Sequence, residues 1–148
     1  MVLLAFAGSL AVYLLVRAVI VTDTKRVARL VERGRSGVVH HDLAQVMSCV
    51  DQSYDDDFGM DYERLHRWFQ HEFAMYDSFV CVIPRLSINV YHREAVCSLM
   101  VWFAGYNRGR KAAPAEEGVL EGFPLYSDRL VIYANRFPEG WLITGAGP

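Results

Sequence analysis

The chain predicts an α+β domain in which helices come first and a meander of antiparallel strands follows. Apolar residues recur at three- and four-residue steps as far as Tyr76 and alternate after Ser78, which indicates a change from helix to strand. With 148 residues, the chain is long enough for one hydrophobic core, and two separate domains are not expected. Residues 22–148 are therefore predicted to form a single domain.

Residues 2–21 form a nearly unbroken apolar run in which Arg17 is the one charged side chain. Twenty helical residues span about 30 Å, the thickness of a bilayer core, and an arginine near one end can reach the headgroups. Residues 1–21 are therefore predicted to be a single-pass transmembrane anchor. A cleaved signal peptide fits less well, because no basic stretch precedes the run and no small-x-small site follows it. A buried core helix is a poorer explanation at this length.

The charge is unevenly distributed along the chain. The net charge of -2 argues against a general nucleic-acid-binding protein. Residues 1–37 hold six basic and two acidic side chains, whereas the remainder is acidic. A basic collar beside an apolar run favours contact with a membrane surface. We therefore expect a membrane localisation, and the side on which the domain lies stays open.

The first two helices of the domain are predicted from short apolar stripes. Residues 22–35 carry apolar side chains on one side and basic ones around them, and Gly34 and Gly37 are expected to mark the end of this helix. Its expected role is to cover the domain. Residues 41–51 have the spacing of a short third helix, counted with the predicted anchor.

Residues 61–76 are predicted to form the central helix. Asp61 is a suitable N-cap, because its carboxylate can accept from backbone N–H groups of the first turn. The apolar positions share one side of the helix, and we expect this side to lie against the sheet. These positions are Tyr62, Leu65, Phe69, Phe73 and Tyr76, with Trp68 beside them.

Four strands are predicted after the central helix. Residues 80–90 alternate, and Pro84 within them predicts an edge strand or a bulge, because proline cannot donate to a ladder. Residues 95–104 are apolar on both faces, which predicts a central strand covered on both sides. Residues 129–135 and 141–144 have the pattern of a hairpin. The last four residues of the chain are expected to fray.

This order of elements resembles that of the nuclear-transport-factor-2-like, cystatin-related superfamily. The resemblance covers about residues 22–144, and it rests on the order, on Tyr54–Gly59, on the aromatic central helix and on a last strand centred on Trp141. It implies a cone-shaped roll, in which a curved antiparallel sheet of four to six strands wraps about three helices and leaves a pocket. The superfamily includes isomerases, cyclases, dehydratases and many non-catalytic domains, so the resemblance implies fold and not function.

Three adjacent acids, Asp55, Asp56 and Asp57, are the most suggestive candidates for chemistry. A carboxylate packed into an apolar cone mouth has a raised pKa and can act as a general base. Under an enzyme hypothesis Asp55 or Asp57 is the base, and a tyrosine such as Tyr54 donates to a developing oxyanion. The simpler interpretation is a solvated loop whose carboxylates cap backbone N–H groups.

A ligand pocket is expected to include four aromatic residues, although core packing explains most of them more simply. They are Trp68, Tyr91, Trp102 and Tyr106. No metal is predicted, because His66 and His71 lie five residues apart and cannot chelate as an i,i+4 pair. The three cysteines have no metal-like spacing, and no cofactor is predicted.

The function predicted first is a membrane-tethered, non-catalytic binding or scaffold domain. The alternative is a small-molecule enzyme of the isomerase, cyclase or hydrolase type with a pocket carboxylate as general base. A third possibility is a domain that carries a lipid or a small ligand. Apolar side chains on both faces of residues 95–104 also suggest a homodimer formed through the outer sheet face.

Overall fold

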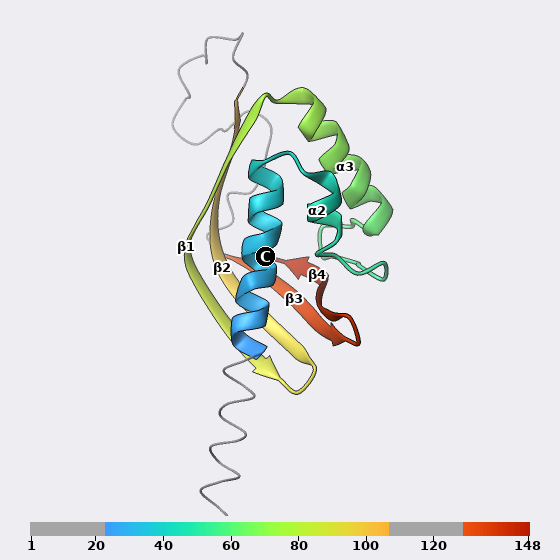
Figure 1. The fold of residues 1–148 in the computed structure, drawn as a ribbon, viewed down its shortest axis with the longest axis vertical. Helices are drawn as coiled ribbons and strands as arrows, with labels where there is room; N and C mark the ends of the chain where they lie inside the picture. The colour runs from blue at the N-terminus through green and yellow to red at the C-terminus, as the bar shows by residue number, and fades with distance from the viewer. Residues whose placement is uncertain (1–22, 107–128) are drawn as a thin grey trace, which may run out of the picture.

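The structure is a computed structural model that describes residues 23–106 and 129–148. A helix covers residues 23–39, followed by α2 (Leu43–Met47) and α3 (Tyr62–Met75). The strands are β1 (Ser78–Tyr91), β2 (Glu94–Tyr106), β3 (Leu130–Phe137) and β4 (Gly140–Gly147). They form one antiparallel sheet in the order β1-β2-β3-β4, which curves around the helices (Figure 1). The predicted α+β class and curved antiparallel sheet are confirmed.

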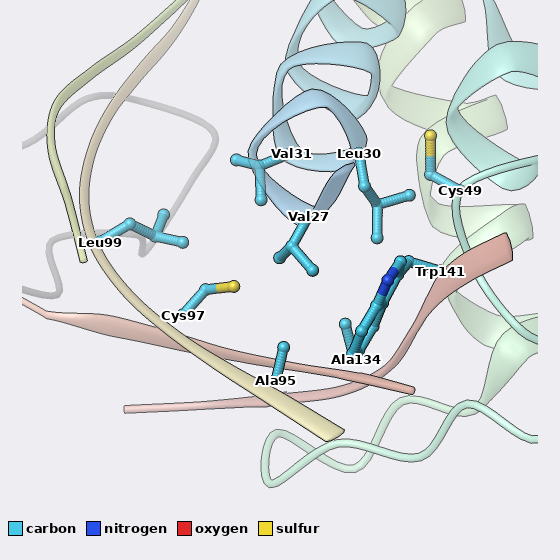
Figure 2. Close-up of a cluster of buried hydrophobic side chains, with 9 residues drawn as sticks. All are labelled: Val27, Leu30, Val31, Cys49, Ala95, Cys97, Leu99, Ala134 and Trp141. Carbon is cyan, nitrogen blue, oxygen red and sulfur yellow. The ribbon is translucent and has the colours of Figure 1, made fainter. Parts of the chain in front are cut away.

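The helix over residues 23–39 lies along the concave face of the sheet (Figure 1). Val27, Leu30 and Val31 on its inner side pack against side chains of β2, β3 and β4 (Figure 2). Val27 and its neighbour in this cluster, Cys97, are completely buried. Burial of one aliphatic side chain contributes roughly 1.5–3 kcal/mol, so this seam fixes the helix in the cone. The predicted cover helix therefore lies along the concave face of the sheet (Figure 1).

Asp23 fastens one end of that helix to the last two strands. Its carboxylate accepts hydrogen bonds from Arg26 and from Arg136 of β3, both at 3.2 Å, and from the indole N–H of Trp141 at 3.5 Å. The Asp23 side chain is buried, whereas both arginines are about half exposed. Because a buried carboxylate without partners would be costly, these bonds specify where the helix sits on β3 and β4.

The α3 helix packs over the beginning of β1 and the end of β2. Asp61 is the N-cap, as predicted, and accepts from the Arg64 backbone N–H at 2.8 Å. Phe73 of α3 lies 5.5 Å from Phe79 between ring centroids, and Phe79 lies 5.0 Å from Phe103. The predicted contact between the aromatic side of α3 and the sheet is confirmed.

Gly34 and Gly37 do not end the first helix, which continues to residue 39. That expectation from the sequence is wrong, and packing supplies the reason. A Cβ built at Gly37 would lie 2.8 Å from Cγ2 of Val46 and 3.0 Å from its backbone nitrogen. The glycine therefore serves the close approach of α2 to the helix, which outweighs its poor helix propensity.

Pro84 lies at an irregularity in an edge strand, which agrees with the sequence. The pairing of β1 with β2 shifts register between Val82 and Arg85, and β1 is the first strand of the sheet. β2 lies between β1 and β3 as predicted. Its outer face is not covered by the described part of the chain, because Trp102 is 70 % exposed. Among the described residues, nothing therefore covers the face that carries Trp102.

The chain end is paired rather than frayed. β4 extends to Gly147 and pairs with β3 on one side. On its other side, the segment 49–57 runs beside it, with backbone bonds from Asp55 N–H to Thr144 O at 3.2 Å and from Asp57 N–H to Ala146 O at 3.0 Å. Pairing on both sides explains why the sequence expectation of fraying fails.

The predicted anchor, residues 1–21, lies outside the described residues. Within residues 23–106 and 129–148, none of the helices has the length and hydropathy needed to cross a bilayer.

The two glycines of the first helix give a matched test of this packing. Gly34→Ala is expected to stabilise the fold by about 1 kcal/mol, because a Cβ there meets nothing within 4 Å and alanine is the better helix former. Gly37→Ala is expected to destabilise it by about 1–3 kcal/mol through overpacking against Val46. Chemical denaturation of both variants measures the two effects, and shifts of the same sign would contradict this account.

Candidate functional site

An apolar cavity of about 200 Å³ lies between the first helix, α3 and the concave face of the sheet. The first helix supplies one side of the cavity and the odd-numbered positions of β2 supply another. Most of the lining is aliphatic or aromatic. The lining residues are Val31, Gly34, Arg35, Val38, Val46, Cys49, Val50, Tyr54, Leu65, Trp68, Phe69, Cys81, Ile83, Leu99, Val101, Phe103, Leu130, Ile132, Ile143 and Ala146.

Few polar groups reach this cavity. Among the described residues that line it, Arg35 carries the one charge, Tyr54 the one hydroxyl, and Cys49 and Cys81 the thiols. No aspartate, glutamate or histidine belongs to that set. The cavity is therefore suited to hold apolar matter and has no side chain of the usual acid–base type in its described walls.

Tyr54 lines the cavity with its ring, but its hydroxyl is committed elsewhere. The O–H donates to Oδ2 of Asp56 at 2.7 Å. Burial, and then this bond to a carboxylate, raise the pKa of Tyr54 well above its ordinary value. The proton stays on the phenol and points to Asp56, so the hydroxyl is not poised to donate to an oxyanion in the cavity.

Asp56 has a structural task in its loop. Its Oδ1 accepts from the backbone N–H groups of Phe58 at 3.0 Å and Met60 at 2.8 Å. Together with the Tyr54 bond, these contacts satisfy the carboxylate and shape the turn that leads into α3. This arrangement matches the simpler interpretation of the acidic run.

Asp55 and Asp57, the candidate bases, are exposed and do not line the cavity. Their backbone N–H groups are both used in pairing with β4. The enzyme hypothesis needs a carboxylate inside the apolar space with a donor opposite, and the structure does not bring Asp55, Asp57 and Tyr54 together in that way.

Of the four predicted pocket aromatics, Trp68 lines the cavity. The other three, Tyr91, Trp102 and Tyr106, are all exposed. The cause is strand parity, because successive side chains point to opposite faces of a sheet. Trp102 lies between two lining residues, Val101 and Phe103, and so points outward.

The thiols of Cys81 and Cys97 are not activated nucleophiles. Burial raises the pKa of Cys81 and of Cys97 to about 11, so both stay protonated near neutrality, and a protonated thiol is a poor nucleophile. Cys49, which is also buried, has its sulfur 3.2 Å from Nε of Arg33.

Glu72 is a buried carboxyl that the sequence did not single out. Its Oε2 has no hydrogen-bond partner within the described structure, and burial raises its pKa. It lies on α3 but does not line the cavity, so it supplies no acid there. No group of three His, Cys, Asp or Glu side chains in residues 23–106 and 129–148 has the arrangement of a metal site.

Arg35 is the lining residue that sequence reasoning missed. It sits on the first helix with its side chain 31 % exposed, so it reaches from the cavity to solvent. Its guanidinium donates to Glu32 through Nε and Nη2, at 2.8 and 2.6 Å, and to the Cys81 carbonyl through Nη1 at 3.0 Å. The i,i+3 spacing of Glu32 and Arg35 was the available signal, but it did not reveal a cavity.

Comparison with known proteins supports the fold. No protein-family model and no curated protein sequence matches the chain. An NTF2-like protein with a cystatin-like fold from Novosphingobium aromaticivorans matches with a TM-score of 0.64 at 12% identity, over 90% of this chain and 85% of that one.

Two further solved structures are similar to the chain. A proposed scytalone dehydratase from Novosphingobium aromaticivorans has a TM-score of 0.65 at 6% identity and covers 86% of this chain and 83% of its own. Bd1075 from Bdellovibrio bacteriovorus has a TM-score of 0.62 at 10% identity over 82% of this chain, which spans 39% of that protein. The described residues, 23–106 and 129–148, therefore have an NTF2-like, cystatin-like fold, and identities this low carry no function with it.

Proposed function

We propose that this chain is a non-catalytic binding domain whose cavity holds a small hydrophobic ligand. The observation that supports the proposal most is the composition of the described lining, which is almost wholly apolar and has no carboxylate or imidazole. Ligand sites are typically concave and apolar with a few polar groups that set orientation. Arg35 is the charged group of this lining.

The cavity volume fits a ligand with one ring and a short arm. A buried apolar cavity of about 150 Å³ is known to bind benzene, and the cavity here measures about 200 Å³. Trp68 and Phe69 in its wall offer ring faces and edges to such a ligand.

An enzyme remains the alternative class, and the proposed scytalone dehydratase among the similar structures belongs to it. The exposed positions of Asp55 and Asp57 and the commitment of the Tyr54 hydroxyl to Asp56 favour the binding domain.

A substitution that fills the cavity with a larger side chain tests the binding proposal. Val101→Phe is expected to weaken binding of 2-phenylethanol roughly tenfold or more, because each 1.4 kcal/mol of lost contact is a factor of ten in affinity. Calorimetric titration of the full chain measures the change. Val96→Phe is the matched control, since Val96 lies on the same strand, β2, and does not line the cavity. Equal binding by both variants, or no binding by the unmodified chain, would contradict the proposal.

Residues 2–21 are proposed to hold this domain at a membrane. The support is the apolar run itself and the basic residues that follow it. Such a tether would concentrate the binding domain where hydrophobic compounds partition.

Ala11→Arg tests the tether, because it places a second charge in the middle of the apolar run at a cost of about 2.5–3.5 kcal/mol. The unmodified chain is expected to stay in the membrane pellet after carbonate extraction, and the variant is expected to lose that retention in part. Gln52→Arg, at an exposed position of the domain, is the charge-matched control. An unmodified chain released into the supernatant would overturn the tether.

A homodimer through the outer sheet face is the proposed assembly. Its support is a patch of exposed side chains, the outer-face patch, where β1 and β2 pair. Val82 lies opposite Trp102 and Val80 lies opposite Ala104, and Val80, Val82 and Trp102 are all exposed. Apolar patches of this kind often mark association surfaces, and tryptophan is enriched among the residues that dominate interface energies.

Trp102→Glu is expected to convert the dimer to a monomer, because a charge in the centre of the outer-face patch would be buried without a partner. Light scattering, with the detergent mass subtracted, reports the change. Asn89→Glu places the same charge on the same face of β1, beyond the patch, and should leave the dimer intact. A monomeric unmodified chain would refute this assembly.

A further inference from the structure

Arg35 stands where the apolar cavity meets solvent. It is the one charged residue among the described lining residues, and its side chain is partly exposed. Its Nη1 donates to the carbonyl of Cys81, a residue that also lines the cavity. That bond fixes the guanidinium between the first helix and β1, at the rim of the cavity.

The guanidinium already binds a carboxylate at this position. Glu32 accepts from both Nε and Nη2, at 2.8 and 2.6 Å, which is the bidentate geometry in which arginine recognises carboxylates. Arginine has five N–H donors, and the bonds to Glu32 and Cys81 use three of them. One N–H on each terminal nitrogen is left without a partner in the described part of the chain.

Glu32 is an exchangeable occupant. Its side chain is 60 % exposed, and ion pairs at the surface of a helix contribute little to stability. The bond to Arg35 lowers the pKa of Glu32, so it is ionised at neutral pH and competes as an anion. A second carboxylate that also gains apolar contact inside the cavity can therefore displace it.

We propose that the ligand class is a small hydrophobic carboxylic acid, with its ring or short chain in the cavity and its carboxylate on Arg35 in place of Glu32. This inference rests on the proposed function, in which the cavity is a ligand site. It adds a specificity for charge, because a neutral compound of the same shape fills the cavity but leaves Arg35 with Glu32. Glu32 then competes with the ligand carboxylate for Arg35, so it lowers the affinity for every acid that binds there.

Phenylacetate and 2-phenylethanol test the inference, because they share a ring and a two-carbon arm and differ in charge at neutral pH. In calorimetric titrations of the full chain, phenylacetate is expected to bind roughly tenfold more tightly, as charge-assisted hydrogen bonds exceed neutral ones. Arg35→Gln is expected to remove this preference, because it takes away the cation that the carboxylate would bind. Glu32→Gln is expected to strengthen binding of phenylacetate several-fold and to leave the alcohol unchanged.

Arg33→Gln is the matched control. It removes the same charge from the same helix, but Arg33 bonds to Cys49 and to the Ser48 carbonyl and does not line the cavity. The preference for phenylacetate should survive in this variant. Alcohol binding without any preference for the acid, or a preference that Arg35→Gln leaves unchanged, would overturn the inference and spare the proposed function. Failure of both compounds to bind would overturn the proposed function and this inference with it.

Discussion

The packing of the first helix into the curved sheet is the contact on which the rest of the structure depends. Val27 and Cys97 meet at complete burial, and Asp23 ties the helix to β3 and β4 through Arg136 and Trp141. Figure 2 shows Val27 of the helix facing Cys97 and Trp141 of the sheet. The later turns of the helix line the cavity, and Arg35 belongs to that lining because the helix continues beyond Gly34.

Backbone pairing decides what the acidic run can do. The N–H groups of Asp55 and Asp57 both bond to β4, and Gly145 permits the close approach, because a Cβ there would lie 2.7 Å from the Asp55 carbonyl oxygen. With the alternate residues 55 and 57 held to a sheet edge, their side chains stay with the solvent. Only Asp56 turns toward the domain, and there it satisfies Tyr54 and two backbone donors. The acidic run, which suggested a catalytic base, thus has a structural role in its loop.

Local patterns in the sequence predicted the helices and strands well. The features that they did not predict depend on contacts between residues far apart in the sequence. Asp61 as N-cap and Pro84 at an irregular edge follow from the chemistry of single residues. Gly37 was misread because only the tertiary contact with Val46 shows that its missing side chain matters. Trp102 was misplaced for a different reason, since an apolar strand on both faces does not reveal which face is inside. Arg35 was missed because its role depends on a cavity that no spacing records.

The alternation of side chains along β2 places some apolar residues in the cavity and others on the outer face of the sheet, which the composition of the strand does not reveal. On β2, Val101 and Phe103 face the cavity, while Trp102 between them faces outward. Aromatic side chains of β2 therefore lie on both faces of the sheet. An acid–base group would need to sit on the inner face, where low polarity would shift its pKa, yet the described inner face carries aliphatic, aromatic and thiol groups with a guanidinium at its rim. A guanidinium can hold an anion without exchanging protons near neutrality, so Arg35 is suited to bind an anion and not to act as a general base.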